Sequence, residues 1–488
     1  MRRVAALLVA SALWGPAAAS TSDAMLKLTP CRLAHPQGLG SVEARCGTLE
    51  VAEEPARPAG RRVGLSIAVL PAISARAKAD PLFLLAGGPG QGAREAFVPL
   101  LGALGGVRRN RDLVLVDQRG TGGSNRLDCT LPLETLEFDT SREQIERLSR
   151  ECLQALPGDP RFYTTSVAVT DLEAVRLALG YPRINLYGAS YGTRVAQHYT
   201  RRYPQHTRSL VLDGVVPPGL VLGPAIAIDA DRALRALFER CAAEPACRVR
   251  YPALEADFAS LQQRLNRQAA KVSLPDPVSG ELAAFELTAG HLLMVTRMSI
   301  YSDLAAAVFP LLVDQAAHHD NFTPLAARAR LIEAEMTGAM AMGMHNAVAC
   351  SEDVPFMDTS QVALEALDDT FLGRHMVEGL QALCAPWPRG HVDSDLQQPL
   401  RSKVPALLLS GELDPVTPPD YGAAAATGFS DAMHLVFRGQ GHIQLVQRCG
   451  QSLLQRFLDA GTTRDLDVRC VDDSRPAPFM VNFNGVAP

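Results

Sequence analysis

The chain has 488 residues, of which 47% are hydrophobic and 20% are charged. This composition supplies a sizeable buried core and excludes a wholly disordered chain. The formal net charge is −5, and the sequence contains no basic run of the kind that follows phosphates, so we expect no nucleic-acid partner.

The N-terminus has the pattern of an export signal. Arg2 and Arg3 form a positive start, an apolar stretch covers residues 4–14, and residues 17–19 are small alanines suited to cleavage. The apolar stretch is shorter than the roughly 20 residues that a spanning helix needs, which disfavours a membrane anchor. We therefore predict a signal peptide over residues 1–19 and an exported chain, either periplasmic or extracellular.

Ten cysteines follow the predicted signal, an even number that favours disulfide bonds in an oxidising compartment. Their close spacing in pairs suggests bonds between neighbours, while free buried thiols and other connectivities stay open. No CxxC pair is present, which disfavours zinc, and we expect no metal. The neighbour pairs are Cys31 with Cys46, Cys129 with Cys152, Cys241 with Cys247, Cys350 with Cys384, and Cys449 with Cys470.

Short apolar runs separated by helical stretches indicate an α/β core behind a predicted hairpin over residues 43–70. Such runs are typical of parallel strands that are buried on both faces. From about residue 221 to 396 the pattern is mostly helical, and strand runs then return. The apolar runs lie at 81–86, 113–117, 184–187, 210–213, 406–410 and 434–437.

This order of strand and helix patterns predicts one α/β unit that is split by a large helical insertion. We assign residues 20–220 to the N-terminal part of the core, 221–396 to a helical cap, and 397–488 to the C-terminal part of the core. The expected fold class is α/β, with a mostly parallel central sheet.

The pentapeptide at residues 188–192, Gly-Ala-Ser-Tyr-Gly, matches the G-x-S-x-G nucleophile pattern. It stands between an apolar strand run and a predicted helix over residues 193–203. A sharp turn in this setting exposes the serine hydroxyl, and the flanking glycines allow close backbone approach. We therefore predict that Ser190 is a catalytic nucleophile rather than part of a structural turn.

A serine hydroxyl needs a base before it can attack. In the fold that carries this motif the chain order is serine, acid, histidine, and two C-terminal loops fit that order. Asp414 follows the strand run at 406–410, and His442 follows the run at 434–437. We predict that His442 accepts the serine proton and that Asp414 orients the imidazole, with Glu412 as the alternative acid.

An acyl-transfer site also needs fixed N–H donors for the oxyanion. One expected donor is the backbone N–H of Tyr191, directly after the nucleophile. The second is expected from the Gly-Gly-Pro-Gly run at residues 87–90. Because Pro89 has no N–H, Gly88 is our first choice for this donor and Gly87 is the alternative. The competing interpretation is that the run forms an ordinary Gly-Pro turn with no catalytic role.

Three motifs together resemble the proline iminopeptidase and tripeptidyl aminopeptidase branch of the α/β-hydrolases. They are the Gly-Gly-Pro-Gly run at 87–90, the Asp-Gln-Arg-Gly-Thr-Gly-Gly-Ser run at 117–124, and the pentapeptide around Ser190. The part from about Gln398 to Cys470 is similar to the TAP-like C-terminal domain of that group. The family usually has a histidine before the Gly-Gly-Pro-Gly run, and this chain has alanine there, which leaves the backbone donors intact.

The resemblance implies the α/β-hydrolase fold and an exopeptidase that acts at a free N-terminus. Relatives hold the α-ammonium of the substrate with acidic side chains from the cap. Glu352 and Asp353 are the candidates here, because a desolvated carboxylate pair can bind an ammonium through charge-assisted hydrogen bonds. A solvated acidic turn or a helix N-cap is the structural alternative. We expect Asp117 and Arg119 to support their loop without taking part in the chemistry.

The predicted function is therefore a secreted serine hydrolase, an aminopeptidase that releases prolyl or short tripeptidyl units through an acyl-enzyme. A carboxylesterase-type hydrolase on the same scaffold is the alternative, because a fold does not determine a substrate. A non-catalytic binding protein is disfavoured by the complete triad pattern. We expect a peptide with a free N-terminus as substrate, no cofactor and no membrane span, and the residues indicate no oligomeric state.

Overall fold

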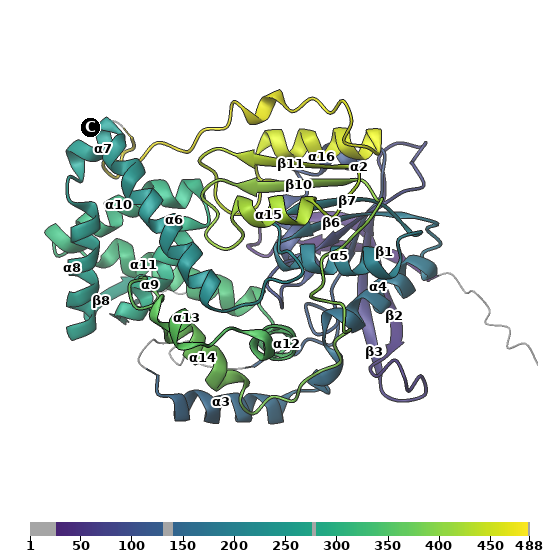
Figure 1. Ribbon diagram of the computed structural model, residues 1–488, viewed down its shortest axis with the longest axis horizontal. Coiled ribbons are helices and arrows are strands. Elements are labelled where there is room, and N and C mark those ends of the chain that lie inside the picture. Colours follow the sequence, from purple (N-terminus) through teal and green to yellow (C-terminus); the bar gives the residue numbers. More distant parts are fainter. Residues whose placement is uncertain (1–25, 130–139, 276–279, 487–488) are drawn as a thin grey trace, which may run out of the picture.

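The computed structural model describes residues 26–129, 140–275 and 280–486, so the signal peptide predicted over residues 1–19 lies outside the described residues. A nine-stranded sheet forms the centre of the molecule (Figure 1). Its strands are β1 (Thr29–Ala34), β2 (Ser41–Ala52), β3 (Arg62–Leu70), β4 (Leu82–Leu85), β5 (Leu113–Val116), β6 (Ile184–Ala189), β7 (Thr207–Asp213), β10 (Ala406–Gly411) and β11 (Ala432–Phe437).

The order of strands across the sheet is β1-β2-β3-β5-β4-β6-β7-β10-β11. Strands β1, β2 and β3 are antiparallel and join β5 in antiparallel register. From β5 to β11 every pairing is parallel. The loops after β6, β7, β10 and β11 therefore leave the same edge of the sheet.

Helices cover both faces of this sheet, which explains why strands such as β4 and β5 are apolar throughout. Two separate clusters of buried side chains fill the two faces. The first face carries α4 (Thr165–Ala178), α5 (Tyr191–Arg202) and α15 (Pro419–Ala426), and the second carries α1 (Ala93–Phe97), α2 (Gly105–Arg108) and α16 (Arg448–Ala460).

Between β7 and β10 the chain forms a helical part, which lies beside the sheet in Figure 1. Most of it has its own hydrophobic core, whereas α12 packs into the core on the first face of the sheet. Within the described residues, no helix is both long and apolar enough to cross a lipid bilayer. The elements of this part are α6 (Pro224–Ala243), α7 (Pro245–Arg250), α8 (Leu254–Arg267), β8 (Ala270–Pro275), β9 (Leu282–Leu287), α9 (Ala289–Ile300), α10 (Asp303–His318), α11 (Thr323–Ala339), α12 (Met342–Val348), α13 (Gln361–Glu365) and α14 (His375–Cys384).

The predicted fold class, a mostly parallel α/β sheet with a helical insertion, is confirmed. The insertion also contains an antiparallel hairpin of β8 and β9, which the sequence analysis did not separate from its helical surroundings. The helices of the insertion begin at Pro224 and end at Cys384, inside the predicted limits of 221 and 396. The division of the chain into separate domains stays a prediction.

Five disulfide bonds join the neighbour pairs that the spacing suggested, and no described cysteine is free. The bonds close loops whose ends lie between 6 and 34 residues apart in sequence. Full pairing of the cysteines is typical of proteins that fold in an oxidising compartment.

The loop after β5 is held by a buried ion pair. Arg119 is 1% exposed, and its Nε and Nη2 donate to the two carboxylate oxygens of Asp171 on α4, at 2.6 and 2.7 Å. It also donates to the carbonyl of Glu53 at 2.8 Å. Asp117 closes the same loop by accepting the N–H of Gly123 at 3.0 Å. The Asp-Gln-Arg-Gly motif therefore supports loop architecture, as expected.

Replacing Arg119 with methionine should lower the free energy of unfolding by about 3–5 kcal/mol, because the substitution leaves the Asp171 carboxylate buried without its partner. Urea denaturation followed by circular dichroism measures this loss. The matched control is Arg32→Met, which breaks the ion pair with Glu43 on the exposed hairpin. That control should leave the unfolding midpoint unchanged, and equal losses in the two variants would contradict the role given to Arg119.

Candidate active site

Ser190 lies at the tip of a tight turn between β6 and α5. Its backbone angles are φ +54° and ψ −124°, a left-handed conformation that costs a non-glycine residue of order 1–3 kcal/mol. The Ser190 N–H donates to the carbonyl of Asp213 on β7 at 2.9 Å, and the Ser190 carbonyl accepts the hydroxyl of Thr193 at 2.6 Å. These contacts on both sides hold the strained turn in place.

The two glycines of the pentapeptide are required by close backbone contacts. A Cβ atom at Gly188 would lie 2.4 Å from the carbonyl oxygen of Gly192, and one at Gly192 would lie 2.2 Å from the carbonyl oxygen of Leu85. Any side chain at these positions would force β4, β6 and α5 apart. The motif thus packs the nucleophile turn directly against the end of β4.

His442 and Asp414 form the hydrogen bond that the sequence analysis expected of a base and its acid. The Nδ1 atom of His442 lies 2.7 Å from Oδ2 of Asp414. Asp414 is 1% exposed, and its Oδ1 accepts the N–H groups of Val416 and Thr417 at 2.9 and 2.8 Å. The alternative acid, Glu412, accepts the N–H of Gly439 and has no contact with the imidazole among the described residues.

The imidazole of His442 lies beside the nucleophile turn. A Cβ atom at Gly214 would lie 2.6 Å from Cε1 of His442, so the ring packs on the backbone at this position. Gly214 directly follows Asp213, which accepts the Ser190 N–H and pairs with Ala189 in the sheet. The imidazole of His442 therefore lies at the carboxyl end of β7, next to the strand end that carries Ser190.

The insertion also contacts the base. The backbone N–H of His442 donates to the carbonyl of Tyr301 at 2.8 Å, and the two rings make an edge-to-face contact with centroids 5.4 Å apart. Tyr301 caps α9 of the insertion. His442 is thus held by the sheet through Asp414 and by the insertion through Tyr301.

Opposing effects set the pKa values of this pair. Burial lowers the pKa of His442, but the nearby Asp414 carboxylate outweighs it, and the His442 pKa is raised above its ordinary value. Burial raises the pKa of Asp414, but the charge of His442 and the backbone donors outweigh it, and the Asp414 pKa is lowered. Asp414 is therefore ionised when His442 accepts a proton, as a triad acid must be.

The expected oxyanion donors border the nucleophile. Tyr191 is the first residue of α5, and Gly87 is in contact with Ser190, because a Cβ atom at position 87 would lie 3.1 Å from the serine Cβ. Gly88 has φ +108°, a conformation reserved for glycine. The ring of His345, on α12, lies 3.1 Å from the carbonyl oxygen of Pro89 and fixes this loop from the insertion side.

Glu352 and Asp353 are buried in the interface between the insertion and α5. Each is 1% exposed, which excludes a solvated acidic turn, and Asp353 makes no side-chain cap. Glu352 accepts the N–H and the hydroxyl of Thr165 at 2.6 and 2.8 Å. Arg194, one turn into α5, donates to Asp353 at 2.9 Å and lies 3.5 Å from Glu352.

This acidic pair is only partly neutralised. Arg194 supplies one positive charge for two carboxylates, and burial raises the pKa of Glu352 to about 7. The Oδ2 atom of Asp353 is buried without a hydrogen-bond partner among the residues that the structure describes. One carboxylate oxygen therefore keeps the capacity to accept a donor.

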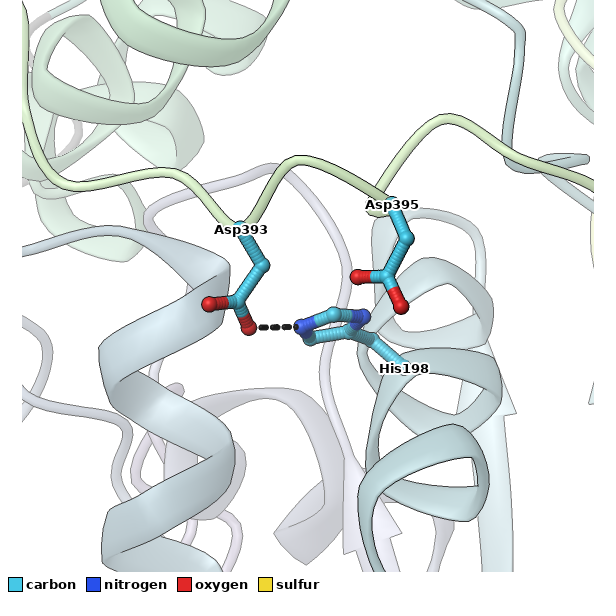
Figure 2. A group of neighbouring side chains, drawn as sticks. All are labelled: His198, Asp393 and Asp395. Carbon is cyan, nitrogen blue, oxygen red and sulfur yellow. Dashed lines mark hydrogen bonds and ion pairs between the residues drawn. The ribbon is translucent and has the colours of Figure 1, made fainter.

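A second polar cluster lies near the C-terminal end of α5, where His198 faces Asp393 and Asp395 (Figure 2). The Nε2 atom of His198 is 2.8 Å from Asp393. Arg202 donates to Asp393 at 3.0 Å and also pairs with Asp395. Because Arg202 pairs with both carboxylates and His198 binds Asp393, we assign the cluster no metal; it fastens the segment between α14 and β10 to α5.

The sequence analysis missed four residues that contact or position the candidate site, namely Asp213, Tyr301, His345 and Arg194. None of them lies in a motif with a fixed spacing to the nucleophile, apart from Arg194 on the helix that follows it. Only Asp213 gave a signal in the sequence, because it ends the apolar strand run at 210–213. A charged residue at such a position predicts a buried partner, since charged residues are seldom fully buried without one.

Comparison with known sequences gives two family matches. Residues 80–280 match the family described as "alpha/beta hydrolase fold", and residues 369–470 match the family described as "TAP-like protein". The first match contains the pentapeptide with Ser190, and the second contains Asp414 and His442.

Three individual proteins illustrate the similarity. The chain is 24% identical to serine protease Hip1 of Mycobacterium tuberculosis, over 91% of this chain and 90% of that protein. It is 28% identical to a tripeptidyl aminopeptidase of Streptomyces coelicolor, over 36% of this chain and 35% of that protein. A crystal structure of proline iminopeptidase from Mycobacterium smegmatis covers 85% of this chain and 98% of its own, with 16% identity and a TM-score of 0.42.

Asp414→Asn should move the acid limb of the kcat/KM profile to lower pH. The substitution removes the charge that raises the His442 pKa, so the imidazole stays neutral, and able to accept a proton, at lower pH. We also expect kcat to fall by about 10⁴-fold, because the neutral amide no longer stabilises the imidazolium. The measurement is a pH–rate profile with a chromogenic substrate.

Glu412→Gln is the matched control, since Glu412 stands two residues away in the same loop without touching the imidazole. Its acid limb should coincide with that of the unmodified enzyme. An unshifted limb in Asp414→Asn, or equal shifts in both variants, would reject Asp414 as the partner of the base.

Proposed function

Since the chain is a serine peptidase of the proline iminopeptidase and tripeptidyl aminopeptidase family of α/β-hydrolases, with a TAP-like C-terminal region, we propose that it is an aminopeptidase that releases prolyl or short tripeptidyl units from free peptide N-termini. The Oδ2 atom of Asp353 carries the proposal, because it is buried without a hydrogen-bond partner among the described residues. It offers a buried acceptor next to α5, the helix that begins directly after Ser190.

In the proposed mechanism Ser190 attacks the scissile carbonyl and forms an acyl-enzyme. His442 takes the hydroxyl proton and returns it to the leaving amine, and Asp414 keeps the Nδ1 proton of the imidazole in place. Water then attacks the acyl-enzyme with His442 again as base. The backbone N–H groups of Tyr191 and Gly88 stabilise the oxyanion in both steps.

The substrate's α-ammonium is bound by the acidic pair in this proposal. Asp353 has the free oxygen, whereas both oxygens of Glu352 already accept hydrogen bonds from Thr165. Thr165 also lies 2.7 Å from the hydroxyl of Tyr191, the residue after the nucleophile. Glu352 directly precedes Asp353, so an ammonium on Asp353 would be held at a fixed distance from Ser190. This distance would determine how many residues the enzyme releases from the N-terminus.

We also propose that the enzyme works after export, in the periplasm or outside the cell. The complete pairing of the cysteines supports this location, as does the N-terminal pattern of arginines, apolar residues and small alanines. Sequencing the N-terminus of the exported protein tests the expected start near Ser20.

Ser190→Ala should lower kcat by about 10⁴- to 10⁶-fold, because the acyl-enzyme can no longer form. Active-site titration with a fluorophosphonate should label the unmodified enzyme and leave the variant unlabelled. The control is an unchanged circular dichroism spectrum, since the hydroxyl makes no contact that the fold requires. Turnover close to that of the unmodified enzyme would reject Ser190 as nucleophile.

Acetylation of the substrate's N-terminus should abolish cleavage, because an amide carries no charge for Asp353 to bind. The measurement compares kcat/KM for matched prolyl and tripeptidyl p-nitroanilides with free and acetylated N-termini. Equal hydrolysis of the two forms would eliminate the exopeptidase and leave an esterase or endopeptidase on the same fold.

Variants of the acidic pair locate the ammonium site in the same assay. Asp353→Asn should raise KM for free peptides at least about tenfold, the loss of one charge-assisted contact, while a simple acetate ester is hydrolysed as before. Glu352→Gln is the matched variant and should have the smaller effect on KM. A larger effect of Glu352→Gln would move the ammonium from Asp353 to Glu352.

A further inference from the structure

Asp213 stands at the carboxyl end of β7, between the strand that leads to the nucleophile and the strand that leads to the acid. It is 0% exposed. In the sheet it pairs with Ala189 on β6 and with Leu409 on β10. Its backbone carbonyl accepts the N–H of Ser190 at 2.9 Å, so its main chain is part of the nucleophile turn.

The side chain of Asp213 binds the loop that carries the base. Its Oδ1 accepts the N–H of Gln444 at 2.7 Å, and its Oδ2 accepts the N–H of Leu445 at 2.8 Å. These donors follow His442 by two and three residues. The hydroxyl of Tyr187, on the nucleophile strand, donates to Oδ2 at 2.7 Å.

We infer that Asp213 is a positioning residue that sets the spacing between the nucleophile and the base, its backbone holding Ser190 and its carboxylate holding the His442 loop. The inference rests on the roles proposed above for Ser190 and His442. Asp213 is not the triad acid, because its oxygens bind backbone N–H groups while the imidazole Nδ1 binds Asp414.

A carboxylate suits this position because three donors converge on it. Two acceptor oxygens satisfy two N–H groups and one hydroxyl, all of them buried. An asparagine has one acceptor oxygen and would turn its NH₂ group against a backbone N–H. The loop would then have to shift, and a displacement of about 1 Å at a reacting group can cost on the order of 100-fold in rate.

The same contacts give the position a pH signature. Burial raises the pKa of Asp213 to about 6, against the lowering effect of its donors, and the titratable groups that face it are Tyr187 and His442. Above this pH the carboxylate is ionised and accepts all three donors. As the pH falls through about 6 it gains a proton, one acceptor becomes a donor, and the hold on the loop weakens.

The test is Asp213→Asn against Asp112→Asn. Asp112 is a matched control, since it also accepts one backbone N–H, from Ala72 at 2.8 Å, and one tyrosine hydroxyl, from Tyr181 at 2.7 Å. It precedes β5, at the edge of the sheet opposite the site. We expect kcat of Asp213→Asn to fall about 100-fold with KM within threefold, and Asp112→Asn to stay within twofold in both.

Tyr187→Phe is the second variant, and it decides the question if Asp213→Asn does not fold. It removes one of the donors that lower the pKa of Asp213, so this pKa should rise. The acid limb of the kcat profile, to which Asp213 contributes beside His442, should then move to higher pH. A purely structural role of Tyr187 would lower the melting temperature and leave the limb in place.

The inference is overturned if folded Asp213→Asn keeps kcat within threefold of the unmodified enzyme, if Asp112→Asn loses as much, or if Tyr187→Phe leaves the limb unmoved. Ser190→Ala is measured in the same assay, so that a failure of the inference about Asp213 can be distinguished from a failure of the proposed function. An active Ser190→Ala removes the mechanism itself, whereas an inactive one beside a normal Asp213→Asn rejects only the role of Asp213.

Discussion

Parallel pairing of β6, β7, β10 and β11 is the constraint on which the site depends. Because these strands run in one direction, the loops that carry Ser190, Asp213, Asp414 and His442 all leave the same edge of the sheet. The hydrogen bond between Asp414 and His442 joins loops 28 residues apart in sequence. The contact of Asp213 with the His442 loop joins residues 231 and 232 positions apart, so it spans the whole insertion.

Local patterns were enough to predict most of the sheet, the turn that carries Ser190, and the pairing of His442 with Asp414. The apolar runs mark β4, β5, β6, β7 and β10 because helices bury both faces of those strands. A run also marks β11, although this edge strand is mostly half-buried, and the turn around Ser190 has its own sequence motif. β1 is mostly exposed and was not predicted, nor was the hairpin of β8 and β9, since alternating exposed strands are easily mistaken for loop or helix in a charged stretch.

The contacts that tune the site could not be predicted, because they are made between parts of the chain that no pattern connects. Tyr301 and His345 reach the base and the oxyanion loop from the insertion. Arg194 changes the chemistry of the acidic pair, since it turns two free carboxylates into an ion-paired cluster in which one oxygen of Asp353 still lacks a donor among the described residues. The insertion therefore contributes residues that contact the candidate site and does not only cover it.

The five disulfide bonds have a consequence for how the chain matures. Each cysteine is joined to its nearest cysteine neighbour along the chain, and no bond ties the insertion to the sheet. Short loops close at a lower entropic cost than long ones, so the correct thiol is also the one met most often during oxidation. The crosslinks can therefore form in any order, and the two halves of the sheet find each other through non-covalent packing alone.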